Sequence, residues 1–374
     1  MSVLNSWQKI SRVIPVRDYG SGAAGSATIS ADPNVRATAS GTASSTSLTI
    51  GSSILANNDV FVIHQSRGSG SGQWEVNKVA SGGGTTSIVC QEALHYSFGS
   101  GAQVIKIPMY STLTNNGYTL TAWDGSTGGI GVLAANESLT MGGTIIGTGL
   151  GFRKPGGARY SGEGTGGNST DMQQQNGNGG GGGWNYTGDL HKHGGGGGGN
   201  ATAGGGGGYS DGATSSGLGG QSSGAADLTS LTFGGGGGSG VSSQYGGAGG
   251  AAMIIFAANF IGSGNINLEA TAADAGDGNG GNGGGAGGSA LLVVGAANLS
   301  SIGINATGTS GTTGGSANGG SGSTGRIAIQ HSGTVTGTTN PTFFDQSDPS
   351  LINDWDYHIP PGLTWGPKIL GPNS

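Results

Sequence analysis

Short runs that alternate apolar and polar residues fill the chain from about Ser26 to Pro108. Clusters of Gly, Ser and Asn separate the runs, and each has the length and the β-branched or aromatic content of a β-strand. The runs are SLTIG, DVFVIHQS, GQWEVNKVAS, TSIVCQ and AQVIKIP. The link RGSGSGQ, before Trp74, is typical of a hairpin loop. We expect residues 26–110 to form a compact β-barrel or sandwich, preceded by an N-terminal arm over residues 1–25.

A strand-turn-strand template recurs after this module. It consists of an apolar run, then Ala-Ala-Asn, a few polar residues, and alternation of the Gly-x-Ile kind. The template occurs at 131–149, 254–272 and 293–311, and a fourth apolar run at 325–330 enters it without the Ala-Ala-Asn. One such unit cannot bury its apolar face alone, so we expect the units to stack. The first repeat falls within residues 111–155 and the others within 251–332.

A glycine-rich insertion over residues 156–250 separates the first repeat from the second. Its uninterrupted glycine runs have nearly equal lengths: Gly179–Gly183, Gly194–Gly199, Gly204–Gly208 and Gly234–Gly238. In polyproline-II-like geometry, at about 3.1 Å per residue, each run spans roughly 15–19 Å. Backbones without side chains can hydrogen-bond in several lateral directions, which favours polyglycine-II helices over a disordered linker. The sharpest form of this prediction is that Gly194–Gly199 bonds to other glycine runs, with a turn at Asn200–Ala203.

Composition is consistent with several small cores instead of one large one. Glycine supplies 88 of 374 residues and hydrophobic residues only 33%, against about 45–50% in ordinary globular domains. The expected fold class is all-β, with an N-terminal small β-barrel or sandwich, stacked strand repeats with a polyglycine-II helix bundle, and a C-terminal cap or docking tail over residues 333–374. The single Cys90 shares a strand face with Ile88, which favours a buried small hydrophobe over a reactive thiol.

Charge and terminal sequence limit the partners that we expect. With 13 Lys and Arg against 19 Asp and Glu, and a net charge of -6, the chain has no basic cluster for binding nucleic acid. The N-terminal stretch MSVLNSWQKISRVIPVRDYG contains no readable secretory signal, and no apolar run has the length of a membrane span. We therefore expect no membrane insertion, and a location in a virion or outside the cell without a readable signal peptide.

Catalytic motifs are not readable, so we expect no enzymatic activity and no cofactor. Gly-Lys-Ser/Thr, His-Glu-x-x-His and Gly-x-Ser-x-Gly do not occur, and the Gly-x-Gly-x-x-Gly string at Gly162–Gly167 carries little information in so glycine-rich a chain. His191 and His193 share a face of an extended segment, as a metal pair needs, but further ligands have no readable spacing, which favours solvent-exposed turn residues and no metal. Asp274 and Asp277 are interpreted as turn formers, with calcium binding left open.

Aromatic residues near the ends of the glycine runs are the candidate receptor-binding residues, together with the two histidines. The set is Trp184, Tyr186, His191, His193, Tyr209 and Tyr245. Aromatic residues on loops that a rigid scaffold holds give contact area at low entropic cost, although they could equally shield the ends of the glycine runs. The C-terminal aromatics Trp355, Tyr357 and Trp365 are candidates for assembly or docking, and with neighbouring carboxylates they could also form a sugar-binding face.

The glycine insertion and its turns, roughly Gly156 to Gly325, resemble the glycine-rich adhesins at the tips of T-even-type phage long tail fibres. In that group, polyglycine-II helices stack into a sandwich and present receptor-binding loops. A second likeness covers roughly Asp59 to Gly157, where VFVIHQSRGSGSGQWEVNKV and LTAWDGSTGGIGVLAANESLTMGGTIIGTGLGFRKPGG are similar to glycine-rich domains of large bacterial surface proteins and of phage structural proteins. It implies no activity.

These resemblances imply a non-enzymatic virion structural protein, most simply a phage tail fibre, tip or decoration protein that binds a host surface receptor. The expected partners are further copies of the chain as a homotrimer or filament, other virion proteins, and a host surface glycan or protein. One alternative is a self-assembling subunit of an extracellular filament or surface layer. A second is an ice-binding protein, although irregular spacer lengths disfavour one flat, regular face.

Overall fold

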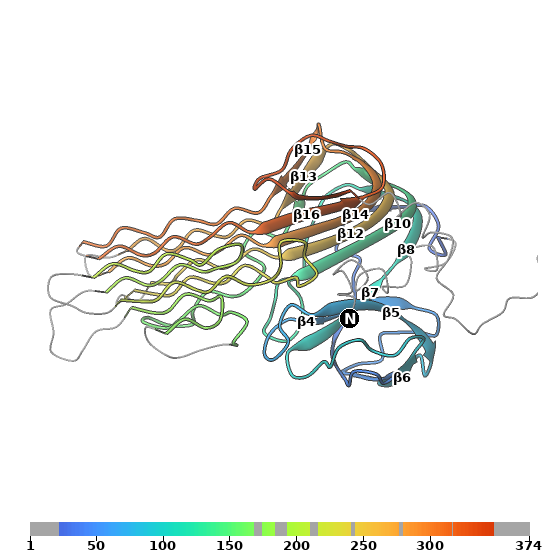
Figure 1. Cartoon of the computed structure of the whole chain (residues 1–374), viewed down its shortest axis with the longest axis horizontal. Coiled ribbons are helices and arrows are strands. Elements are labelled where there is room, and N and C mark those ends of the chain that lie inside the picture. The colour runs from blue at the N-terminus through green and yellow to red at the C-terminus, as the bar shows by residue number, and fades with distance from the viewer. Residues whose placement is uncertain are drawn as a thin grey trace, which may run out of the picture.

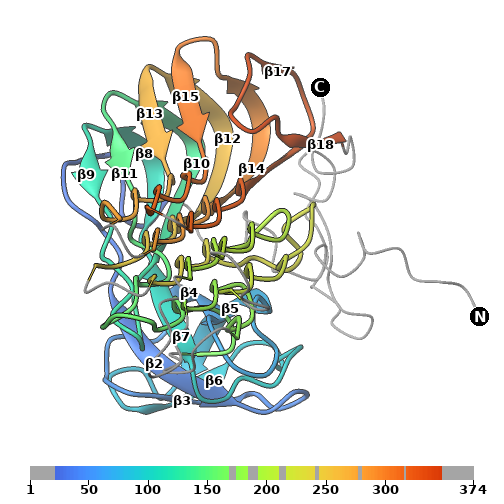
Figure 2. The ribbon, with the colours of Figure 1, turned by 90° about the vertical axis from the view of Figure 1, so that its left-hand side faces the viewer.

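The computed structural model describes residues 22–167, 174–183, 193–209, 216–240, 244–276, 280–315 and 317–347. Three bodies make up these residues: a β-barrel, a pair of parallel sheets beside it, and an array of glycine-rich segments that projects from the strand ends (Figure 1). Figure 2 views the molecule from the free end of these segments, which lie in rows.

The barrel is closed and antiparallel, with the strand order β2-β3-β6-β5-β4-β7. Its strands are β2 (Arg36–Gly41), β3 (Ser47–Ile50), β4 (Val60–Gln65), β5 (Trp74–Ser81), β6 (Ser87–Cys90) and β7 (Ala102–Ile107). Side chains alternate between the two faces of a strand. In β3, Leu48 and Ile50 are therefore buried in the barrel core, while the residues that alternate with them are exposed.

Two parallel sheets contain the remaining strands. The eight-stranded sheet contains β1 (Ala27–Ile29), β8 (Met109–Asn115), β10 (Ile130–Met141), β12 (Ala252–Gly262), β14 (Ser289–Asn298), β16 (Arg326–His331) and β18 (Phe344–Ser347) in that order, with β17 (Val335–Thr336) paired to β14. The four-stranded sheet has the order β15 (Ile302–Asn305), β13 (Gly264–Asn267), β11 (Ile145–Ile146), β9 (Tyr118–Thr119). The strands β8, β10, β12 and β14 are each followed by a short strand of the second sheet.

Two successive steps in the eight-stranded sheet, from β12 to β14 and from β14 to β16, have the same spacing. Ala252 pairs with Ser289, and Ser289 pairs with Arg326, so each step is 37 residues long. The central strands are buried on both faces, as parallel strands usually are. In β12, Ile255 packs in the core between the two sheets, whereas Ile254 packs in a second core shared with the barrel and the glycine-rich insertion.

Glycine-rich segments make the crossovers between the parallel strands. From the end of β13 the chain runs out along residues 268–274 and returns along 280–288 into β14, and from β15 it runs out along 305–313 and returns along 317–325 into β16. Between β11 and β12 the excursion is longer. It adds the segments 159–164, 176–183, 193–199, 204–209, 216–223, 231–240 and 244–251. We call these eleven segments the glycine array.

Segment 193–199 lies at the centre of the glycine array and bonds to six neighbours. The direction in which its N–H groups donate repeats every three residues. Gly194 and Gly197 donate to segment 204–209, Gly195 and Gly198 to 280–288, and Gly196 and Gly199 to 176–183. Its carbonyls accept from segments 216–223, 231–240 and 317–325. The hydrogen bonds required of this run by the sequence analysis are therefore present, and the three-residue period is that of a three-residue-per-turn extended helix.

The close approach of these backbones explains why glycine is needed at interior positions. A Cβ on Gly196 would overlap the carbonyl of Leu218, and a Cβ on Gly198 would overlap the carbonyl of Gly235. By contrast, a Cβ on Gly206, at the outside of the glycine array, would meet only the carbonyl oxygen of Gly217, at 3.8 Å. At positions such as these two, a side chain would separate the hydrogen-bonded segments.

The fold class expected from the sequence is wrong. An all-β fold of stacked strand repeats with a polyglycine-II helix bundle was expected, but the repeats do not stack face on face. Their strands pair edge to edge in parallel sheets of eight and four strands, an arrangement like that of α/β folds, although no helix occurs among the described residues. Glycine segments occupy the crossover positions that helices usually fill. Most of the expected C-terminal cap lies outside the described residues, which end at Ser347.

Candidate functional site

The end of the glycine array that is farthest from the sheets, called here the distal end, holds the sequence-predicted residues that the structure describes. Asn200 donates to Gly287 and Gly288, next to β14, so His193 lies at the opposite end of its segment. Three predicted residues, His193, Tyr209 and Tyr245, are described. The others, Trp184, Tyr186, His191, Trp355, Tyr357 and Trp365, lie outside the described residues.

His193, the first residue of segment 193–199, and Tyr209, the last residue of segment 204–209, form an antiparallel β-bridge. Tyr209 is 59% exposed, whereas His193 is only 6% exposed. The expectation of a solvent-exposed His193 is therefore wrong. Its Nδ1 is buried and has no hydrogen-bond partner among the described residues, and the same holds for the hydroxyl of Ser239 in segment 231–240. Only Tyr209 of this pair offers an accessible surface for recognition.

Tyr245 belongs to a second cluster at the distal end. The ammonium of Lys154 lies 5.2 Å from the centre of the Tyr245 ring, and its Nζ lies 3.8 Å from Asp274 Oδ2. Asp274 Oδ2 also accepts from the Tyr245 backbone N–H at 3.2 Å, and the Asp274 N–H donates to the Tyr245 carbonyl at 3.0 Å. The Asp274 carboxylate thus joins two segments. Its predicted partner Asp277 lies outside the described residues.

Tyr209 and Tyr245 lie on separate parts of the distal end. Segment 204–209 bonds to 193–199, segment 193–199 bonds to 231–240, and 231–240 bonds to 244–251. Two segments therefore lie between the two tyrosines. The structure does not bring the described aromatics into one cluster, so recognition by both would need an extended ligand or two contact points.

Within the part of the chain that the structure describes, no group of three or more His, Cys, Asp or Glu residues could hold a metal ion. In the same residues, no helix has the length and apolar character needed to cross a membrane. A shallow, largely apolar groove lies away from the glycine array, at the bend of β12 and β14. Its lining residues are Asn259, Ile261, Ala296, Ala297, Asn298, Thr334 and Thr336.

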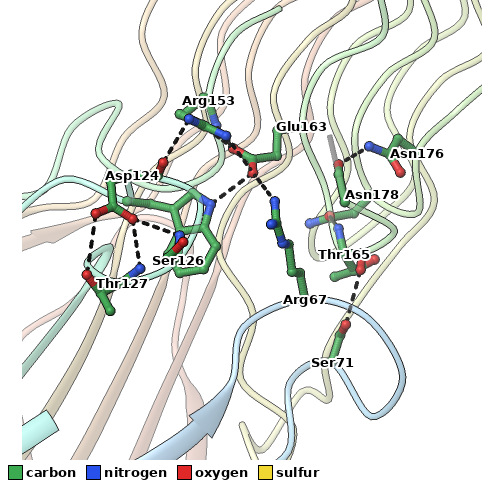
Figure 3. Close-up of polar contacts among 12 residues, drawn as sticks. Arg67, Ser71, Asp124, Ser126, Thr127, Arg153, Glu163, Thr165, Asn176 and Asn178 are labelled. Carbon is green, nitrogen blue, oxygen red and sulfur yellow. Dashed lines mark hydrogen bonds and ion pairs between the residues drawn. The ribbon is translucent and has the colours of Figure 1, made fainter. Parts of the chain in front are cut away.

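A buried carboxylate fixes the barrel to the glycine array (Figure 3). Glu163 Oε1 accepts from Arg67 Nη1 of the β4–β5 loop at 3.1 Å and from Trp123 Nε1 at 3.0 Å. Glu163 Oε2 accepts from Arg153 Nε at 2.8 Å and from the Arg153 backbone N–H at 3.1 Å. The hydrogen bond to Glu163 raises the pKa of Arg153 above its ordinary value. A carboxylate that is fully paired in this way can be buried at low cost.

A second joint connects the barrel wall with the start of segment 231–240 and with the loop before it. His64 of β4 is fully buried, and its Nε2 donates to the Leu231 carbonyl at 2.8 Å. Its Nδ1 therefore accepts from the Ser66 hydroxyl, at 2.9 Å. Trp74 Nε1 donates to the Leu228 carbonyl at 3.0 Å. Burial lowers the pKa of His64 to about 4, so this joint is built around a neutral imidazole.

Sequence reasoning missed both joints. Glu163 lies inside the Gly-x-Gly-x-x-Gly string that was interpreted as uninformative, and His64 lies in a strand where it was not distinguished. One signal was available for the first joint. Arg153, Lys154, Arg159 and Glu163 form a cluster of charges in a sparsely charged region. No comparable signal marks His64, because its partner is a backbone carbonyl 167 residues away.

Comparison with models of known protein families, with curated proteins and with solved structures finds no match to this chain.

Proposed function

We propose that this chain is a non-enzymatic structural protein of a virus particle, a phage tail fibre, tip or decoration protein, and that the distal end of its glycine array binds a receptor on the host surface. The observation that carries the proposal is the hydrogen bonding of segment 193–199 to six neighbours. A body of that kind is held together mainly by backbone hydrogen bonds between glycine segments, and it carries Tyr209 at the end farthest from the sheets.

Rigid support favours recognition at the distal end. Residues held on a stiff scaffold lose little conformational entropy on binding, so each contact yields more affinity. Tyr209 supplies a large, amphipathic and exposed side chain at the distal end, and such side chains are typical of recognition surfaces. The partner that fits an exposed tyrosine without a deep pocket is a surface glycan or a protein loop.

The proposal is tested with labelled full-length protein on whole cells of candidate bacterial hosts and on a glycan array. Tyr209→Ala is expected to reduce binding at least tenfold, which corresponds to about 1.4 kcal/mol. Tyr245→Ala tests the second cluster independently. The matched control is Phe344→Ala, because Phe344 is 45% exposed but lies on β18, at the edge of the eight-stranded sheet.

Two results would contradict the proposal. One is wild-type binding to no host surface, and the other is unchanged binding by both tyrosine variants. Electron microscopy of the purified protein adds a separate measurement. Discrete particles agree with a tip or decoration protein, whereas long polymers would favour a filament subunit.

A further inference from the structure

Segment 204–209 forms an incomplete edge of the glycine array. It bonds to segments 193–199, 216–223 and 317–325, which is half the number of neighbours that segment 193–199 has. Among the described residues, the Gly206 N–H has no hydrogen-bond partner, and neither do the carbonyls of Gly204, Gly206 and Gly207. At Gly206, which is exposed, a donor and an acceptor of the kind that is paired inside the glycine array therefore face outward, whereas Gly207 is buried.

Glycine at position 206 has no explanation within a single chain. Gly206 is exposed, its φ is not positive, and a Cβ there would have only the Gly217 carbonyl oxygen at 3.8 Å. Alanine would fit and would lower the entropy of the unfolded chain. Inside the glycine array, glycine is needed wherever another backbone approaches closely. A missing side chain at an exposed edge is explained if a further backbone also approaches there.

The edge also lacks the devices that usually prevent edge-to-edge association. Exposed β-edges are commonly protected by charged side chains or proline. Residues 203–209 and 216–223 contain neither. They carry two of the exposed large apolar side chains instead, Tyr209 at 59% and Leu218 at 46% exposure. Nothing in these two segments repels a second copy of the same surface.

We propose that the run Gly204–Gly208 is the contact between two copies of this chain, paired about a twofold axis. A twofold axis perpendicular to a segment places the segment antiparallel to its own copy, and this is the pairing that we have in mind. Segment 204–209 already runs antiparallel to each of its neighbours: Gly197 donates to Gly205 and Gly194 to Gly208, and toward segment 317–325 Gly205 donates to Ser321 and Gly208 to Asn318. The second copy thus continues an existing hydrogen-bond pattern. This pairing is independent of what the distal end binds.

The test is the oligomeric state of the full chain, measured by sedimentation velocity over a wide range of concentrations. Wild type is expected to form a dimer at high concentration. Gly206→Ala places a methyl group between the two backbones and should raise the dimer dissociation constant at least tenfold. Gly206→Asp adds a charge at the edge and should raise it further. Gly156→Ala is the control, because Gly156 is exposed and its Cβ would have nothing within 4 Å.

Circular dichroism and the melting temperature of each dilute variant show whether it is folded. A folded Gly206→Ala protein that is monomeric, beside a dimeric Gly156→Ala, supports the pairing. A wild-type chain that stays monomeric at every concentration overturns it. Dimerisation that Gly206→Ala and Gly206→Asp leave unchanged also overturns it, since the contact then lies elsewhere.

Discussion

The carboxylate of Glu163 and the guanidinium of Arg67 lie 3.1 Å apart, from Oε1 to Nη1, although 96 residues separate them in the chain. The Glu163 side chain is 1% exposed and that of Arg67 is 28% exposed. Arg67 comes from the barrel, and the Glu163 backbone carbonyl accepts from Gly236 within the glycine array. The pair therefore couples the barrel to the glycine array by a polar contact, beside the apolar core that the barrel and the insertion share.

Glu163→Ala should destabilise the protein by about 3–5 kcal/mol, the usual cost of removing one partner from a buried ion pair. Arg67, Arg153 and Trp123 would each lose a hydrogen-bond acceptor. Urea unfolding measures the change. Lys154→Ala is the control, because the Lys154 ion pair with Asp274 is about half exposed and should contribute less than about 1 kcal/mol. Equal losses in the two variants would contradict a special role for Glu163.

Gly196→Ala should destabilise the glycine array by about 3 kcal/mol or more, because the new Cβ would overlap the Leu218 carbonyl in a tightly packed interior. Gly156→Ala should change the free energy of unfolding by less than about 1 kcal/mol. Thermal unfolding gives the stability, and hydrogen exchange of the Gly195–Gly199 amides reports locally. Exchange in Gly196→Ala as slow as in wild type would contradict the close approach of the segments.

Most strands of the barrel could be predicted from the local sequence pattern. Alternation identified the runs that became β3 to β7, because a strand buried on one face repeats its polarity every two residues, as Leu48 and Ile50 do. The glycine runs could also be recognised locally, because runs of residues without side chains cannot form an ordinary hydrophobic core. In both cases the information lay within a few consecutive residues.

Pairing and burial between distant residues could not be predicted in that way. Ile254 and Ile255 are both buried, so β12 shows no alternation of apolar and polar residues. The sequence therefore does not indicate which of its residues face the second sheet and which face the barrel. The 37-residue register from Ala252 to Ser289 is a property of the pairing and is not visible in the composition. For the same reason the repeats were expected to stack. The burial of His193 could not be predicted either, because it depends on segments that are distant in the sequence.

Acidification should weaken the barrel joint through His64. Its pKa is lowered by burial from about 6.5 to about 4, so above pH 6.5 the imidazole is neutral in both the folded and the unfolded chain. Between pH 6.5 and pH 4 the unfolded chain binds a proton that the folded chain does not. The free energy of unfolding should therefore fall with decreasing pH in this window, by up to about 3 kcal/mol.

His64→Gln removes this titration while keeping a side-chain donor for the Leu231 carbonyl. Its unfolding free energy should depend less steeply on pH between 6.5 and 4 than that of wild type, even if it is lower at every pH. His95→Gln, at an exposed position on the barrel, is the control. Identical slopes for wild type and His64→Gln would show that His64 is not the titrating group.

Cys90 should report when the barrel opens. It is 1% exposed, which confirms the prediction of a buried small hydrophobe, and burial, aided by the nearby Glu75 carboxylate, raises the pKa of its thiol to about 12. A thiol reagent at pH 8 should therefore label the native protein at least about a thousandfold more slowly than the unfolded chain, because only the small open fraction reacts.

Leu94→Ala, in the same core as Cys90, should speed labelling, since such truncations cost about 2–5 kcal/mol of stability. Ile304→Ala, in the core between the two sheets, should leave the rate unchanged if the barrel opens on its own. Equal acceleration by both variants would mean instead that the barrel and the sheets unfold as one unit.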